Sequence, residues 1–247
     1  MTNETTARRA LACLDLTDLG DSTSQEETSR LIARGQTAFG PVAAICIWPQ
    51  FVSGAAQRLR GSHIHLATVI NFPAGGEDIE RAVDDVREAL RDGADEIDLV
   101  LPWRALRRGD HQLARAMVEA VAGCLPKDCK LKVIIESGEL DDPALIDAAS
   151  RIAIAAGAHF IKTSTGKTPV STTLAAARVM LTAIRDSGRP VGFKASGGIR
   201  SLEDAKLYLD LADEIMGPDW ARPETFRFGA SGLLDALLAA LRDGGGA

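Results

Sequence analysis

The 247-residue chain alternates short apolar runs with longer segments of helical periodicity from one end to the other. The runs that we predict as strands are Ala10–Leu16, Val42–Ile47, His65–Ile70, Glu96–Leu101, Leu131–Glu136, Phe160–Thr163, Val191–Lys194 and Phe226–Gly229. A predicted helix follows each of them, at Glu26–Arg34, Phe51–Arg60, Asp78–Arg91, Asp110–Cys124, Pro143–Ala156, Thr173–Ser187, Leu202–Leu211 and Leu233–Leu241. Continuously apolar strands separated by helices are typical of a parallel sheet covered by helices. Eight such units favour one α/β domain over residues 1–247, a (β/α)8 barrel of the TIM type with a short N-terminal extension, rather than a doubly wound sheet.

The charge of the chain argues against several classes of partner. The formal net charge is −6, the pI is near 5.3, and no segment is densely basic. Binding to nucleic acid or to an anionic membrane surface needs clustered lysine and arginine, so neither partner is expected. No apolar stretch is long enough to span a bilayer, and MTNETTARRALACLD lacks the apolar core of a signal peptide. We therefore expect a soluble, cytoplasmic protein.

Neither the cysteines nor the histidines form a metal-binding pattern. The cysteines are Cys13, Cys46, Cys124 and Cys129, which include no CxxC pair and are expected to be reduced thiols. His63 and His65 lie at the start of a predicted strand, on the face of a barrel that serves stability rather than catalysis. We therefore expect no metal ion.

Charged residues occur on four neighbouring strands where the barrel interior should be apolar. Side chains alternate along a barrel strand, so in EIDLVL the apolar Ile97 packs under the helices and Asp98 points inward. The same parity turns Glu136, Lys162 and Lys194 inward. One buried charge is usually part of a structural salt bridge, but four near the same barrel mouth are typical of a functional site.

Lys162 and Lys194 lie on consecutive predicted strands, so their amines should be neighbours. An ordinary lysine, with a pKa of about 10.4, is only about one part in 2,500 neutral at pH 7, and only the neutral amine attacks a carbonyl. A second ammonium and partial burial both disfavour the charged form and so lower the pKa of the nucleophile. Asp98, across the barrel mouth, can transfer protons during imine formation and carbon–carbon cleavage. The three residues predict an imine-forming site.

Two glycine-rich loops, SGGIRS (196–201) and FGASG (228–232), follow the last two predicted strands. In barrels these loops commonly hold a phosphate with backbone N–H groups and a helix N-terminus. The candidate phosphate-binding residues are Gly166, Lys167, Gly197, Gly198, Gly229 and Ser231. TSTGKT ends like a nucleotide-binding P-loop, but Ile161 stands where the first glycine is required, so a nucleotide is not expected.

Eight short phrases, spread in order over nearly the whole chain, carry a family resemblance. They are LDLTDL, AAICIWP, ATVINFPAG, GADEIDLVLP, LKVIIESGEL, FIKTSTGK, VGFKASGGIR and RFGASGLL. Together they resemble the deoxyribose-phosphate aldolases, which are class I (Schiff-base) aldolases. The resemblance implies reversible cleavage of 2-deoxy-D-ribose 5-phosphate to acetaldehyde and D-glyceraldehyde 3-phosphate, without a metal or organic cofactor. It implies Lys162 as the Schiff-base nucleophile, Lys194 as the lysine that perturbs it, and Asp98 as the proton-transfer residue.

The resemblance also implies where the substrate binds. Asp15 and Thr17 match polar groups near the substrate hydroxyls, and Lys167 matches a position that lines the phosphate end. Cys46 matches a cysteine near the acetaldehyde end, although a small core thiol explains it equally well. Gly232 stands where some members have a second serine, so one phosphate hydrogen bond would be missing. The expected partner is a small phosphorylated sugar, with a homodimer as the candidate assembly.

Two other functions stay open. One is a Schiff-base barrel aldolase that uses a different aldehyde or keto donor. The other is a non-catalytic barrel that binds a sugar phosphate, a reading that leaves the lysine pair unexplained.

Overall fold

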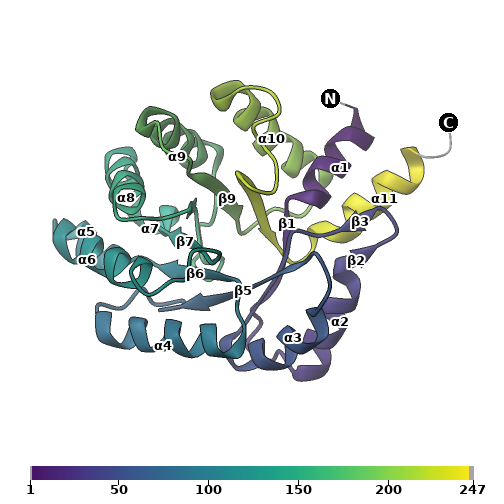
Figure 1. Cartoon of the computed structure of the whole chain (residues 1–247). Helices are drawn as coiled ribbons and strands as arrows, with labels where there is room; N and C mark the ends of the chain where they lie inside the picture. The colour runs from purple at the N-terminus through teal and green to yellow at the C-terminus, as the bar shows by residue number, and fades with distance from the viewer. Residues whose placement is uncertain (1, 245–247) are drawn as a thin grey trace.

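A computed structural model describes residues 2–244, and eight parallel strands in it close into a barrel with helices outside (Figure 1). The strands are β1 (Leu14–Asp18), β4 (Ala44–Ile47), β5 (His65–Ile70), β6 (Glu96–Val100), β7 (Lys130–Ile134), β8 (Phe160–Lys162), β9 (Gly192–Ser196) and β10 (Phe226–Ala230). Each strand pairs with its neighbours along the chain, and β1 closes the barrel by pairing with both β4 and β10. The predicted (β/α)8 barrel is confirmed. A separate antiparallel pair, β2 (Gln36–Thr37) and β3 (Gly40–Pro41), lies between α2 and β4 in the chain.

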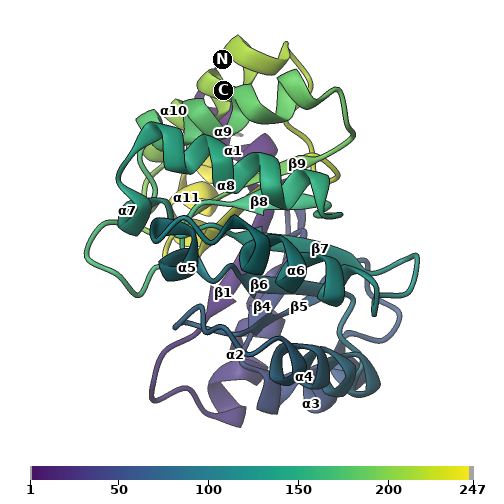
Figure 2. The ribbon, with the colours of Figure 1, turned by 90° about the vertical axis from the view of Figure 1, so that its left-hand side faces the viewer.

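One helix or helical pair follows each barrel strand. The helices are α2 (Gln25–Gly35), α3 (Val52–Leu59), α4 (Ile79–Asp92), α6 (His111–Ala122), α8 (Pro143–Ala155), α9 (Leu174–Ser187), α10 (Leu202–Met216) and α11 (Leu233–Gly244). Short helical turns precede some of them, namely η1 (Pro49–Phe51), α5 (Trp103–Arg107) and α7 (Ser137–Leu140). Figure 2 shows α4, α6 and α8 side by side on one flank of the barrel. Among residues 2–244, no helix has the length and apolar character needed to cross a membrane.

The prediction of a strand over Ala10–Leu16 is wrong in its first half. Residues 10–12 instead form the last turn of α1 (Asn3–Ala12), and β1 begins only at Leu14. The buried residues Ala7, Ala10 and Leu11 have helical spacing. At the other end of the helix, Thr2 caps the first turn by accepting a hydrogen bond from the backbone N–H of Thr5. The short apolar run therefore belongs to two elements, and α1 packs beside α11, the last helix (Figure 1).

Capping residues mark the ends of several helices. Ser201 and Asp204 make a reciprocal capping box at the start of α10. Gly93 ends α4 in the left-handed conformation, with φ of 103°, and Gly157 after α8 has φ of 108°. These caps set where each helix stops and the next strand can enter the barrel.

The barrel interior has two sectors. Outward side chains of the strands join the helices in one continuous apolar core. Inside the barrel, a second and smaller apolar cluster gathers small side chains from β4 and β5, namely Ala44, Cys46, Ala67 and Val69, with Leu19. Charged side chains from the other strands occupy the rest of the interior. The interior thus places a small apolar wall opposite a group of ionised residues.

Candidate active site

Seven charged side chains lie inside the barrel, each no more than 4% exposed. They are Asp15 on β1, Glu96 and Asp98 on β6, Lys132 on β7, Lys162 on β8, Lys194 on β9 and Arg227 on β10. We call these seven residues the inner charge cluster. Isolated charges are expensive to bury, so the hydrogen bonds within the cluster decide which charges can persist.

Asp98 bridges the two lysines that the sequence singles out. Its Oδ2 atom accepts hydrogen bonds from Lys162 Nζ at 2.7 Å and from Lys194 Nζ at 2.9 Å. Its Oδ1 atom accepts a hydrogen bond from Lys132 Nζ at 2.9 Å. Burial alone would raise the pKa of Asp98, but the three ammonium groups hold it well below its usual range. Asp98 therefore lies between the amines and in contact with them, whereas the sequence predicted a position across the barrel mouth.

The two lysines sit side by side, as the sequence predicts, because β8 and β9 pair with Lys162 opposite Lys194. Burial lowers the pKa of Lys162, and the neighbouring charge of Lys194 lowers it further, against the opposing effect of Asp98. Burial also acts to lower the pKa of Lys194, but the carboxylates of Asp15 and Asp98 outweigh it and raise that pKa. Lys162 is thus the amine that loses its proton more readily, while Lys194 keeps its charge.

Three members of the cluster, namely Glu96, Lys132 and Arg227, were not identified from the sequence. Lys132 Nζ forms an ion pair of 2.5 Å with Glu96, and Arg227 forms one of 2.9 Å with the same carboxylate. The parity that turns Asp98 inward also turns Glu96 inward. On β7, Lys132 precedes the outward Val133, and on β10, Arg227 stands between two outward phenylalanines. Alternation alone could therefore have found all three residues.

Glu136 does not join the lysines. It follows β7 in the left-handed conformation, with φ of 54°. Its carboxylate accepts hydrogen bonds from the backbone N–H and the hydroxyl of Thr165. Glu136 therefore anchors the loop after β8, and burial raises the pKa of its carboxyl group.

A cavity of about 320 Å³ opens at the carboxyl ends of the strands, and we call it the carboxyl-end pocket. All six candidate phosphate-binding residues line it, namely Gly166, Lys167, Gly197, Gly198, Gly229 and Ser231. Thr17 lines it as well. The backbone at Gly166, Gly197 and Gly198 has φ of 77°, 86° and 83°, a region that favours glycine. The two glycine-rich loops and the loop after β8 thus meet in one pocket.

The remaining candidates lie at different depths. Lys167 reaches outward, where its Nζ pairs with Asp21 at 2.8 Å, so it is distinct from the buried Lys162. Cys46 is fully buried in the small apolar wall, and burial raises the pKa of its thiol. Asp15 is also fully buried, and its two oxygens accept hydrogen bonds from Lys194 and Arg227. Its predicted contact with a substrate hydroxyl stays a prediction.

A closed (β/α)8 barrel with a bridged lysine pair at its carboxyl end has the parts of a Schiff-base aldolase. Comparisons with known proteins agree, since the pattern of a family described as DeoC/LacD family aldolase matches residues 12–238. A deoxyribose-phosphate aldolase of Agrobacterium fabrum (strain C58) is 52% identical over 239 residues, covering 96% of this chain and 92% of that protein. The chain therefore belongs to the DeoC/LacD family of aldolases, and the family resemblance of the sequence is confirmed.

Solved structures share the fold. A proposed deoxyribose-phosphate aldolase from Toxoplasma gondii ME49 superposes with a TM-score of 0.90 at 23% identity, covering 98% of this chain and 97% of that chain. The deoxyribose phosphate aldolase from Aeropyrum pernix, described as having a unique tetrameric structure, gives a TM-score of 0.75 at 23% identity, with 96% and 92% of the two chains covered. At these identities the similarity bears on the fold alone.

Proposed function

We propose that this chain reversibly cleaves 2-deoxy-D-ribose 5-phosphate to acetaldehyde and D-glyceraldehyde 3-phosphate through a Schiff base on Lys162. Support from relatives comes from the 52% identity to an enzyme named deoxyribose-phosphate aldolase. The observation that carries the proposal is the single oxygen of Asp98 that accepts hydrogen bonds from both Lys162 and Lys194.

The proposed reaction begins with Lys162. Its neutral Nζ attacks C1 of the open-chain sugar, and Asp98 relays a proton from nitrogen to the C1 oxygen to give a carbinolamine. A second proton, taken up from solvent and released again when the imine is hydrolysed, converts this hydroxyl to water, which leaves to give an iminium ion. The C2–C3 bond then breaks as the C3 hydroxyl loses its proton, and the bonding electrons move into the iminium to form an enamine. Release of D-glyceraldehyde 3-phosphate, protonation of the enamine at C2 and hydrolysis of the imine return acetaldehyde and the free amine.

Lys194 is the proposed electrostatic partner of the nucleophile. Its own charge is stabilised by Asp15, at 2.5 Å, and by Asp98. A permanent ammonium beside Lys162 disfavours a second ammonium there, so more of the Lys162 amine is neutral at pH 7. Lys194 then acts without forming a bond to the substrate.

The two ends of the substrate have matching surroundings. The carboxyl-end pocket offers backbone N–H groups and the side chains of Lys167 and Arg200 to a phosphate. Ser196 in that pocket stands two residues after Lys194 on β9, so the phosphate end adjoins the amines. The small side chains of Cys46 and Ala67 leave an apolar wall suited to the two-carbon fragment.

Product analysis separates this proposal from the two alternatives. The purified protein is incubated with D-glyceraldehyde 3-phosphate and one of three donors: acetaldehyde, pyruvate or dihydroxyacetone phosphate. We expect 2-deoxyribose 5-phosphate from acetaldehyde alone. Product from pyruvate or dihydroxyacetone phosphate would favour a different Schiff-base aldolase. Binding of the sugar phosphate without turnover of any donor would favour a non-catalytic barrel.

Assembly and location stay predictions. We infer a homodimer as the candidate assembly. Sedimentation equilibrium should then give twice the chain mass of 26.2 kDa. A cytoplasmic location is inferred from the sequence, and fractionation of the source cells tests it.

A further inference from the structure

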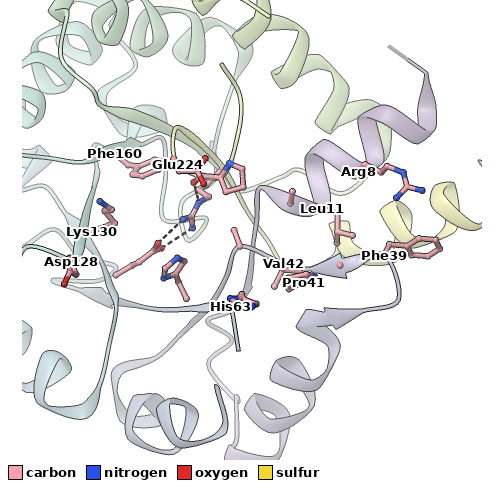
Figure 3. A pocket seen from close by; sticks show the side chains of 17 residues that line it. Arg8, Leu11, Phe39, Pro41, Val42, His63, Asp128, Lys130, Phe160 and Glu224 are labelled. Atoms are coloured by element: carbon pink, nitrogen blue, oxygen red, sulfur yellow. Dashed lines mark hydrogen bonds and ion pairs between the residues drawn. The ribbon is translucent and has the colours of Figure 1, made fainter. Parts of the chain in front are cut away.

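The inner charge cluster extends through the barrel to its amino-terminal end. There a second cavity, of about 470 Å³, opens between the first residues of the strands, and we call it the amino-end pocket (Figure 3). Glu96 and Arg227 line this pocket and form an ion pair there. The proposed reaction at the opposite end of the barrel assigns no role to Arg227.

Arg227 is held firmly in one position. Its Nη1 donates to Asp15 Oδ1 at 2.6 Å, and its Nη2 donates to Glu96 Oε1 at 2.9 Å. Its Nε donates to the backbone oxygen of Pro223 at 2.6 Å. A guanidinium fixed by two carboxylates and a carbonyl keeps its charge at every pH at which the protein is folded.

An unbroken chain of hydrogen bonds joins Arg227 to Lys162. Asp15 accepts from Arg227 with one oxygen and from Lys194 Nζ with the other, at 2.5 Å. Lys194 Nζ also donates to Asp98 Oδ2, which accepts from Lys162 Nζ. Any change of charge at Arg227 therefore reaches Lys162 through buried groups that water does not screen.

The charges in the cluster balance only when Lys162 is neutral. The three carboxylates are Asp15, Glu96 and Asp98, and the three cations besides Lys162 are Lys132, Lys194 and Arg227. A buried cluster with net charge is costly, so its members titrate toward neutrality. With all six of these groups ionised, a proton on Lys162 would leave one uncompensated positive charge.

The other groups that face Lys162 lie outside the chain of hydrogen bonds from Arg227. On β4, the thiol of Cys46 is neutral because burial raises its pKa. On β5, the interior residues Ala67 and Val69 do not titrate. After β7, the Glu136 carboxylate accepts hydrogen bonds from Thr165 and none from the seven cluster residues, so its contribution is the same in every variant compared below.

We propose that Arg227 is a positioning residue for catalysis, whose fixed charge supplies the third buried cation and thereby leaves Lys162 without a proton. Glu96 acts in the opposite sense, because its carboxylate is one of the three negative charges that a cation must balance. The inference rests on the proposed function, since it requires Lys162 to be the amine that forms the imine. Arg227 itself touches neither the substrate nor the reacting atoms.

The test is the pH dependence of imine trapping at Lys162. The full chain and its variants are incubated with acetaldehyde and cyanoborohydride from pH 5 to pH 10, and the rate of adduct formation at Lys162 is followed by peptide mass mapping. In Arg227→Gln the midpoint of the curve of trapping rate against pH should move upward by about one pH unit. This is the size expected for a unit charge across a buried cluster with an effective dielectric constant of about 20. In Glu96→Gln the midpoint should move downward.

Two further variants separate charge from structure. Arg227→Lys keeps the positive charge and should retain the wild-type midpoint even if the rate falls. The double variant Glu96→Gln/Arg227→Gln removes one charge of each sign and should return the midpoint to within a few tenths of a unit of the wild type. If Arg227→Gln does not fold, the downward shift in Glu96→Gln and its reversal in the double variant carry the test.

The outcomes are distinct. Midpoints that do not move, or that move in the same direction in folded Arg227→Gln and Glu96→Gln, would overturn this inference while an adduct at Lys162 still supports the proposed function. A wild-type protein that forms no adduct at Lys162 at any pH would overturn both.

Discussion

Replacement of Lys194 by methionine should protonate Lys162 and slow imine formation at neutral pH. Both amines donate to Asp98 Oδ2, at 2.7 Å and 2.9 Å, so they lie within about 6 Å of each other. At an effective dielectric constant of about 20, a unit charge at about 6 Å contributes about 3 kcal/mol, which corresponds to about two pH units. Without the Lys194 ammonium, Asp98 also interacts more strongly with a protonated Lys162, which raises the pKa of Lys162 further.

The assay is the rate of cyanoborohydride trapping with acetaldehyde as a function of pH. In Lys194→Met the rate at pH 7 should fall about a hundredfold, and the loss should shrink as the pH rises and deprotonates Lys162. Lys167→Met is the matched control, because Lys167 pairs with the exposed Asp21 outside the inner charge cluster. It should weaken binding of the phosphorylated sugar but leave the trapping rate unchanged.

Two results would refute this reasoning. An unchanged pH profile in folded Lys194→Met would mean that the neighbouring charge does not set the protonation state of Lys162. A loss of rate that persists equally at pH 10 would mean that Lys194 acts by holding geometry rather than by its charge.

Two glycine substitutions and the acid stability of the protein each probe one part of the site. In Gly229→Ala the new Cβ would lie 2.9 Å from Lys194 Cε and displace that lysine, so kcat/KM should fall by about tenfold or more. Wild-type kinetics in this variant would contradict the contact. In Gly232→Ser the side chain enters open space at the carboxyl-end pocket and adds a hydroxyl donor for the phosphate. The KM for the phosphorylated sugar should therefore fall by a few fold. An increased KM would argue against a phosphate there. The pKa of Asp98 is lower in the folded than in the unfolded protein, so the ionised carboxylate stabilises the folded state. This contribution is complete above about pH 4 and is lost as the pH falls further. A Tm that stays constant from pH 5 to pH 3 would contradict the ion pairs.

Much of the site could be predicted because the barrel strands have a strict alternation. Parity alone identified Asp98, Lys162 and Lys194 as inward residues, and loop position identified the glycines that line the carboxyl-end pocket. These features depend on local sequence and on the regular order of the units, both of which are visible without coordinates.

The pairing of the charges could not be predicted in the same way. Strands in a closed barrel are staggered, so residues that share an inward parity meet at levels that only the register fixes. Glu96 and Arg227 meet near the amino-terminal end, while Glu136 faces the loop after β8 and bonds Thr165. Parity indicated the direction of Glu136 but not its partner.

The N-terminal error has a different cause. The run around Ala10 is apolar enough for a strand, and its residues also fit the buried stripe of a helix. The cap at Thr2 and the packing of α1 beside α11 decide the outcome, and the second of these is a contact between opposite ends of the chain.

Borohydride trapping of the wild-type protein with acetaldehyde, followed by peptide mass mapping, tests the role of Lys162 most directly. We predict a two-carbon adduct on Lys162, which disappears in Lys162→Ala and persists in Lys167→Met. No adduct on the folded protein, or an adduct on Lys167 instead, would contradict the assignment of Lys162 as the Schiff-base nucleophile.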